Sequence, residues 1–377
     1  MQSENKSSLW YWMLIILPSF AALLTLQREY ALGSILVILM LTCLRIGSDA
    51  EQTFFGSLGE LSIVATVATV LYRFGSFNWM YPPQPSDPAL NELFIDSNLL
   101  AKDLLFQTSF AVSASLYFAA RPLRLPLHSK VVCLFAFVLL AYPAMGYWAW
   151  ARSALGDTSF QDFAGGTVVF AIAGWAGLAL TLLESPRPTT TELNTMRRVI
   201  YSIGIMILLL TNILPIGFGG GDEMLQKIYV NNLLAMGAGA VAASLIGPLI
   251  FRSWNLRYTV VGFISALACV SSWVDQASDL QAIIFGTFSG LLAIAALRFV
   301  EIIIPRDNLD LVVALASGGT SGAILIGFLP NGDLRQQLLG MVICIGLSGT
   351  LGLVGWITKL VSDRWGSRLK TANPVGS

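Results

Sequence analysis

The stretch Asp162-Phe163-Ala164-Gly165-Gly166-Thr167-Val168-Val169 opens an apolar run that extends to residue 184. An aspartate at this point can accept hydrogen bonds from the amides that the first turn of a helix leaves without partners, so Asp162 is a candidate helix N-cap. The paired glycines allow another backbone to come close. A spanning helix needs about 20 mostly apolar residues. We therefore interpret residues 162–184 as a membrane-spanning helix.

The composition of the whole chain is that of a membrane protein. Of its 377 residues, 55% are hydrophobic and only 12% are charged, and the mean hydropathy is +0.71. A soluble domain has about a quarter of its residues charged. The net charge is zero, which gives no general field to attract nucleic acid. We expect one membrane domain over residues 1–361, followed by a tail at 362–377.

Twelve apolar runs meet the length criterion for spanning helices, and an even number places both termini on one side. If the N-terminus is cytoplasmic, 16 of the 22 Lys and Arg residues lie inside, as expected for a protein of the inner (plasma) membrane. The first run could instead be a signal peptide, although Gln27-Arg28-Glu29 is not a small-residue cleavage pattern. The runs are 9–27, 30–47, 52–74, 99–120, 130–150, 162–184, 199–216, 224–251, 258–276, 280–299, 310–329 and 335–361.

The residue types that catalytic and metal sites require are sparse. The four cysteines each sit in an apolar run without CxxC spacing, which indicates small buried hydrophobes rather than metal ligands or a disulfide. His128 is the single histidine, and one histidine without a cysteine partner argues against a zinc site. Gly219-Gly220-Gly221 follows no predicted strand, so it is not a nucleotide loop. We expect no cofactor, no metal and no enzyme active site in this region.

Ionisable residues at membrane depth cost about 3 kcal/mol or more, so each is a functional hypothesis. The candidates are Glu60, Asp162 and Asp310. Asp162 and Asp310 stand at the starts of their helices, where an N-cap role is the plain alternative. Glu60 lies further into its helix, and both a structural partner and a site role remain open for it.

Two segments carry a resemblance to a known family. The stretch 162–169 is similar to the DFAGGTVVH signature of the Amt ammonium transporters, with Phe170 in place of the histidine. The segment 310–319 resembles the DxxxxHGxxG pattern that supplies a second pore histidine, and here Leu315 occupies that place. The chain is thus identified as a member of the Amt/Rh/Mep family that lacks the twin pore histidines. The resemblance implies an all-α polytopic membrane bundle of about 12 helices with inverted repeats, in which 9–27 fits the extra N-terminal helix of Rh proteins.

The resemblance also implies where ammonium binds. Trp150 lies twelve residues before Asp162 and resembles the family's pore-mouth tryptophan, although an interfacial anchor is the alternative. The segment 106–111 resembles FQxxFA, whose second phenylalanine belongs to the gate below the outer site. The segment 211–221 should bring a second gate phenylalanine and an accepting serine, but its residues settle no register. The implied ligand-binding residues are Trp150, Phe110 and Asp162, and the implied pore and gate residues are Phe106, Phe170, Leu315 and Asp310.

Three functions remain in competition: a non-conducting ammonium sensor, an ammonium transporter or channel, and a structural subunit. The family implies a homotrimer in the lipid bilayer. Replacing both histidines removes the polar groups of an apolar pore, which favours binding without conduction. The tail after residue 361 is basic and lacks the family's ExxGLDxxxHGE pattern. It could begin a connector to a cytoplasmic signalling module, which could include a fused enzyme beyond Ser377.

Overall fold

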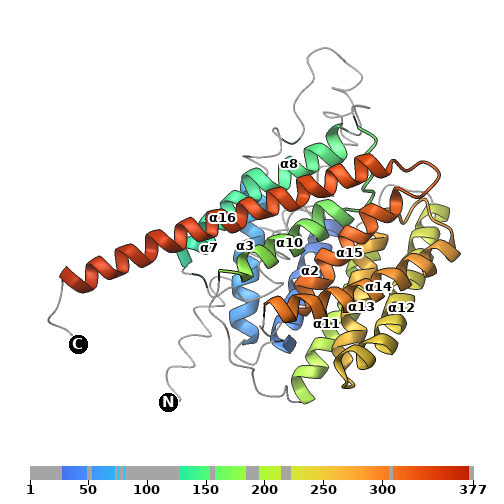
Figure 1. Cartoon of the computed structure of the whole chain (residues 1–377), viewed down its shortest axis with the longest axis horizontal. Helices are drawn as coiled ribbons and strands as arrows, with labels where there is room; N and C mark the ends of the chain where they lie inside the picture. Colours follow the sequence, from blue (N-terminus) through green and yellow to red (C-terminus); the bar gives the residue numbers. More distant parts are fainter. Residues whose placement is uncertain are drawn as a thin grey trace, which may run out of the picture.

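The computed structural model describes residues 28–48, 53–72, 127–152, 158–183, 195–213, 222–304 and 309–372, together with the single positions Gly75, Met80 and Leu125. Over these ranges every regular element is a helix, and the helices pack side by side as one bundle (Figure 1). Ten of the predicted spans coincide with described helices. The predicted helices 9–27 and 99–120 lie outside the described residues, and so does most of the stretch 75–97 that separates the predicted spans 52–74 and 99–120.

Four of the described helices are long and apolar enough to cross a bilayer: Leu127–Trp150, Gln226–Phe251, Asp279–Ile303 and Leu334–Ser362. Shorter apolar helices accompany them. The elements in chain order are α2 (Arg28–Ser48), α3 (Phe54–Leu71), α7 (Leu127–Ala136), η2 (Phe137–Ala141), α8 (Tyr142–Gly146), η3 (Tyr147–Ala151), η4 (Gly166–Ala171), α10 (Ile172–Thr181), α11 (Thr195–Ile213), α12 (Asp222–Phe251), α13 (Leu256–Val270), α14 (Asp279–Ile303), α15 (Asp310–Ile326) and α16 (Leu334–Ala372).

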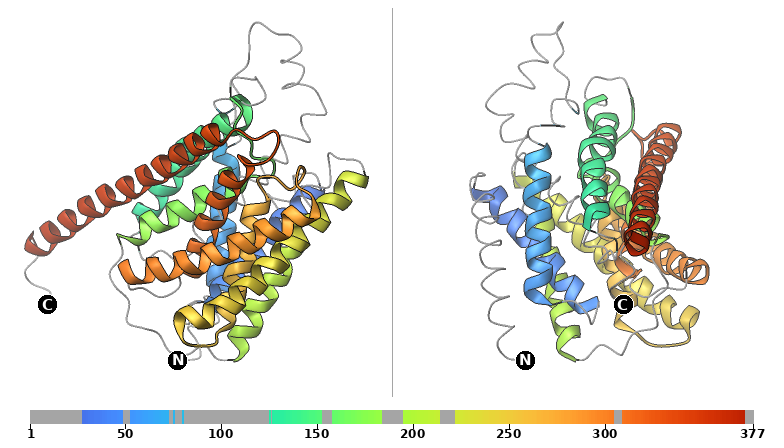
Figure 2. Two further views of the ribbon diagram at one scale, coloured as in Figure 1. Left: turned by 45° about the vertical axis from the view of Figure 1, so that its right-hand side comes forward. Right: turned by 90° about the vertical axis from the view of Figure 1, so that its left-hand side faces the viewer.

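Two of these helices end elsewhere than predicted. The span predicted at 258–276 stops as α13 at Val270, because the chain turns over residues 271–276, where the Ser271 hydroxyl bonds back to the carbonyl of Leu267. The span predicted to end at 361 continues as α16 to Ala372. Figures 1 and 2 show α16 crossing the bundle beside α10 and projecting beyond it at its C-terminal end.

The predicted helix 130–150 is observed as one helix with two π-helical segments, η2 and η3. Pro143 follows the first segment, and its missing amide cannot bond to the preceding turn. The π-helical turn of η2, in which the amide of Tyr142 bonds to the carbonyl of Phe137, accommodates the missing amide without a sharp kink in the helix. The second π segment carries Trp150.

Two clusters of charged side chains join helices of the bundle. In the first, Glu60 of α3 pairs with Arg45 of α2 and with Lys130 of α7, at 3.2 Å in both cases. Arg45 is fully buried, whereas the side chain of Glu60 is 30% exposed. The sequence left the role of Glu60 open, and the structure gives it two basic partners. Its carboxylate therefore ties three helices together.

In the second cluster Arg257 of α13 binds both Glu301 of α14 and Asp310 of α15, the latter at 2.7 Å. The N-cap residue of α15 is Leu309, with no side-chain cap, so the predicted N-cap role of Asp310 is wrong. Asp310 is the first residue of the helix itself, and its carboxylate is paired with the full opposite charge of the Arg257 guanidinium. The four cysteines are buried, as predicted, and no disulfide joins them.

Candidate functional site

Trp150 and Asp162 lie together although twelve residues separate them. The indole Nε1 of Trp150 donates a hydrogen bond of 2.7 Å to the carbonyl oxygen of Asp162. The ring is half-buried and packs against the two largest apolar clusters of the bundle. This bond fixes the orientation of the indole at the end of the helix that contains η3.

The side chain of Asp162 accepts hydrogen bonds from amides in the first turn of η4, although Asp162 itself precedes that helix. Its Oδ2 accepts from the amides of Thr167 and Val168, at 2.9 and 2.8 Å. The residue at the N-cap position is Gly165, whose φ of 83° is in the left-handed region that glycine tolerates. The aspartate therefore satisfies helix amides, as predicted for a cap, but it does so from three residues before the N-cap position.

Three buried oxygen atoms near the start of η4 have no hydrogen-bond partner in the described part of the chain. They are Oδ1 of Asp162, Oγ1 of Thr167 and Oγ of Ser272. All three residues are at most 4% exposed. The backbone amide of Phe163 bonds to the carbonyl of Ser272 at 3.0 Å, so the segment after Asp162 lies against the end of α13. The site thus holds a carboxylate and two hydroxyls with unused acceptor capacity.

Sequence reasoning missed Ser272 and Thr167 as site residues. Thr167 is inside the signature stretch, but nothing in the sequence indicated that its hydroxyl would lack a backbone partner. Ser272 belongs to the turn after α13, more than 100 residues from Asp162, and no pattern in the sequence links the two. Only the fold brings them together.

Polar side chains hold the segment before Asp162 against two neighbouring loops. The side-chain amide of Gln161 accepts from Gln276 at 3.1 Å and donates to the carbonyl of Asn331 at 2.9 Å. The Ser159 hydroxyl donates to Asp333 at 2.7 Å. That bond and the amides of α16's first turn hold the pKa of the Asp333 carboxyl below its usual value. The loop before Asp162 is therefore bonded both to the turn after α13, through Gln276, and to the loop before α16, through Asn331 and Asp333.

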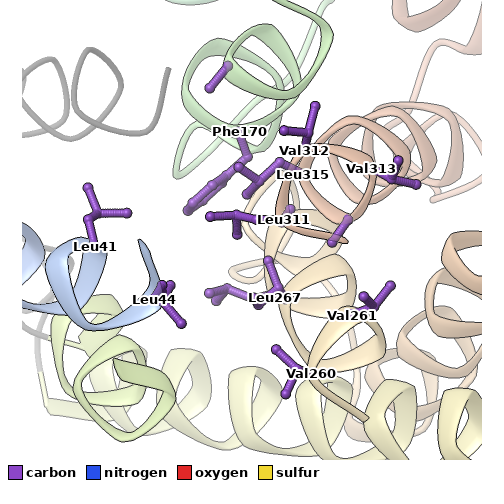
Figure 3. Packing of buried hydrophobic residues seen from close by; sticks show 14 of the residues in the cluster. Leu41, Leu44, Phe170, Val260, Val261, Leu267, Leu311, Val312, Val313 and Leu315 are labelled. Carbon is purple, nitrogen blue, oxygen red and sulfur yellow. The ribbon is translucent and has the colours of Figure 1, made fainter. Parts of the chain in front are cut away.

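Phe170 and Leu315, which stand where the resemblance implies histidines, lie in the same apolar cluster (Figure 3). The helices that carry them meet at backbone contact: a Cβ added to Gly174 would lie 2.2 Å from the amide nitrogen of Ala316, and one added to Gly319 would lie 2.3 Å from the carbonyl oxygen of Gly166. Phe170 is 9% exposed and Leu315 is 1% exposed. The same cluster includes the aliphatic side chains of Leu41, Leu44, Leu267 and Leu311, of which Leu311 lies beside Leu315 in Figure 3.

Some candidate residues cannot be placed. Phe106 and Phe110 lie outside the described residues, and so do residues 214–221 of the segment from which we carried over no residue. Asp310 is described, but its carboxylate is bound to Arg257 at the first residue of α15. Within the described residues no group of three or more His, Cys, Asp or Glu side chains could hold a metal ion.

Comparisons with known proteins identify the family of this chain. The model of the Ammonium Transporter Family matches residues 33–361. This chain belongs to the ammonium transporter family. The protein sll1017 of Synechocystis sp. (strain PCC 6803 / Kazusa), which is named as an ammonium transporter, is 24% identical over 376 residues, covering 89% of this chain and 82% of that protein.

Solved structures show the fold of the family. A structure described as a sensor Amt protein superposes with a TM-score of 0.75 at 18% identity, covering 92% of this chain and 93% of that one. Mep2 of Candida albicans superposes with a TM-score of 0.73 at 19% identity, covering 91% and 86%. The ammonium transporter family member described here is therefore an α-helical membrane protein with the Amt/Mep/Rh fold, and its relatives are transporters and channels rather than enzymes.

Proposed function

We propose that this family member is an ammonium receptor that binds ammonium at its outer mouth and does not conduct it. The observation that carries the proposal is the packed apolar cluster at Phe170 and Leu315. Among the described residues of this cluster, which are apolar apart from the hydroxyl of Tyr258, a polar species would lose its hydrogen bonds to water at a cost of several kcal/mol.

Binding at the mouth needs an attractive surface and acceptors. The face of the Trp150 indole can attract a small cation through the ring quadrupole, at about 0.5–2 kcal/mol. Ammonium carries four N–H donors, and the buried oxygens Oδ1 of Asp162, Oγ1 of Thr167 and Oγ of Ser272 are candidate acceptors, although the Ser272 hydroxyl also interacts with the Asp162 carboxylate. Phe110 completes the aromatic wall in this proposal, with Phe106 beside it as a gate residue.

A receptor must also pass on the binding event. α10 follows η4 directly, and α16 is bonded to it twice: Ser348 donates to the carbonyl of Ile172 at 3.3 Å, and Lys359 donates to that of Leu183, just after α10, at 2.5 Å. A movement of η4 would therefore displace α10 and, through these two bonds, α16, which continues to Ala372. Ligand can shift such an equilibrium only by its differential affinity for the two arrangements. We propose that α16 leads to a cytoplasmic signalling module and that the protein is a homotrimer.

The first prediction concerns conduction. Purified protein reconstituted on a solid-supported membrane and exposed to an ammonium jump should give no sustained current, because the apolar cluster offers no path for a polar species. In parallel, calorimetric titration with ammonium chloride should give a saturable signal, and choline chloride should give none. A sustained current that scales with protein density would overturn the receptor proposal and leave the transporter. Absence of both current and binding would leave the structural subunit.

The second prediction concerns the indole. Trp150→Leu should weaken ammonium binding by about 1–2 kcal/mol, since it removes the aromatic face. Trp150→Phe keeps a ring but loses the bond to Asp162, so it should weaken binding less. Trp254→Leu is the matched control, because Trp254 is 83% exposed and lies far from Asp162 in the chain. Unchanged affinity in Trp150→Leu, measured by the same titration, would move the site elsewhere.

The third prediction concerns topology. We propose that both termini face the cytoplasm and that the protein sits in the plasma membrane, on the basis of the 16 of 22 basic residues that this orientation places inside. A reporter active only in the cytoplasm should work when fused after Lys370 and should fail when inserted in the loop 75–97. The opposite pattern would reverse the orientation.

The transporter is the second candidate, and family membership favours it. Conduction would require another polar group to replace the histidines. Glu60 is a poor substitute because its carboxylate is already paired with Arg45 and Lys130.

A further inference from the structure

Gln337, in the first turn of α16, is a buried polar side chain that bonds to the loop before Asp162. Its side-chain amide accepts from the backbone amide of Gln161 at 2.7 Å and donates to the carbonyl of Ala323 in α15 at 3.3 Å. Gln337 is fully buried, and Gln161 directly precedes Asp162. This one side chain therefore joins the loop of the candidate site, α15 and α16.

Two further contacts hold the same loop against the start of α16. The Ser159 hydroxyl donates to the carboxylate of Asp333, the residue directly before the helix, at 2.7 Å. The ring of Phe160 is fully buried and packs on the backbone of α16, since a Cβ added to Gly340 would lie 2.2 Å from its Cε2. With the bond to Gln337, these interactions form what we call the loop–α16 contact, between residues 158–161 and 333–340.

α16 connects this contact with distant parts of the molecule. It is one continuous helix from Leu334 to Ala372, and its part Leu334–Ser362 is long and apolar enough to cross a bilayer. Val361 lies about 36 Å along the helix axis from Gln337, at 1.5 Å per residue. A packed helix can carry a displacement of one end to the other. A movement of the loop before Asp162 would therefore reach the far end of α16.

Glutamine is mostly an exposed residue, and a buried amide is tolerated when its donor and its acceptor are both used. Gln337 meets that condition only while the loop stays in place, because its acceptor bond comes from Gln161. We propose that the loop–α16 contact, with Gln337 at its centre, passes occupancy of the ammonium site to α16. Gln337 is then a positioning residue that acts through the loop. This inference rests on the proposed function and adds a direct connection to the two bonds between α16 and α10.

The test uses the purified full chain in detergent, with a bimane fluorophore on Val361→Cys. Val361 is 53% exposed, and the four native cysteines are buried. Ammonium chloride should change the bimane emission saturably, and choline chloride should not. Gln337→Met in this labelled chain should lose most of the change. It should still bind ammonium in calorimetric titration, because the bond between Trp150 and Asp162 does not involve Gln337.

Ser289→Ala is the matched control. Ser289 is fully buried, and its hydroxyl bonds to those of Ser265 and Ser321, which joins α13, α14 and α15 outside the loop–α16 contact. Its thermal midpoint should fall, since buried hydroxyls lose a partner, but its change in emission should persist. Ser159→Ala removes only an exposed bond of the loop–α16 contact, so it should fold normally and show a smaller change in emission.

Two results would overturn the proposal directly: ammonium binding without any change in emission in the labelled parent chain, and an undiminished change in Gln337→Met. Loss of the change in Ser289→Ala would also overturn it, because general loosening of the bundle would then explain the effect. If Gln337→Met does not fold, Ser159→Ala decides, and an undiminished change there overturns the proposal. If the parent chain does not bind ammonium in the calorimeter, the proposed function itself fails.

Discussion

Glu60→Gln is expected to destabilise the protein by about 2–3 kcal/mol, one of the two largest effects that we anticipate. Breaking a buried ion pair typically costs about 3–5 kcal/mol because one charge is left uncompensated. The cation that loses this partner is Arg45, which is fully buried, whereas Glu60 is 30% exposed, so we expect an effect at or below the lower end of that range. The measurement is the midpoint of thermal unfolding in detergent, followed by tryptophan fluorescence.

Removing both charges should restore much of the loss. The double variant Glu60→Gln/Arg45→Met removes the buried guanidinium together with the carboxylate, so it should unfold at a higher temperature than Glu60→Gln alone. Lys130→Met should have a smaller effect, since Lys130 is 23% exposed and Glu60 keeps Arg45. If Glu60→Gln unfolds at the wild-type temperature, the ion cluster does not hold α2, α3 and α7 together. Its carboxylate would then be available for another role.

The membrane helices could be predicted because apolar length alone specifies them. The run 280–299, for example, appears as α14 over Asp279–Ile303. Local backbone detail could not be predicted in the same way. The π segments beside Pro143 and the end of α13 at Val270 depend on particular hydrogen bonds, which the pattern of apolar residues does not indicate. The sequence also could not show whether Asp310 caps its helix, since the competing guanidinium of Arg257 lies 53 residues away.

The candidate site was predictable in part. The signature stretch pointed to Asp162 and to the missing histidine at Phe170, and the interval to Trp150 matched the family. The shared cluster of Phe170 and Leu315 depends on glycines in two distant helices, Gly174 and Gly319, whose packing partners only the fold reveals. Asn231 and Asn232 look alike in the sequence. Within the described residues the side chain of Asn231 donates two hydrogen bonds to the turn after α13, whereas that of Asn232 makes none.

The second large effect is expected from restoring both histidines. Phe170→His/Leu315→His should convert the protein into an ammonium conductor, with a current at least about 100-fold above that of the wild type if the barrier falls by about 3 kcal/mol. The backbone contacts at Gly174 and Gly319 fix the helices, so the two imidazoles would lie within one cluster. Each could then donate to or accept from the other. Solid-supported membrane recordings with an ammonium jump measure the result.

Each single histidine variant should be less stable than the wild type. Phe170→His or Leu315→His alone buries an imidazole that has no partner among the aliphatic side chains around it, at a cost of about 1–3 kcal/mol. In the double variant the two rings can hydrogen-bond to each other. Its loss of stability should therefore be smaller than the sum of the losses in the two single variants, as a double-mutant cycle would show. Phe170→Leu controls for volume, because it opens space without adding a polar group, and it should not conduct. If Phe170→Leu conducts as well as the double-histidine variant, steric closure rather than missing polarity keeps the wild type shut. If the double variant is coupled in stability yet silent, the barrier lies elsewhere along the path.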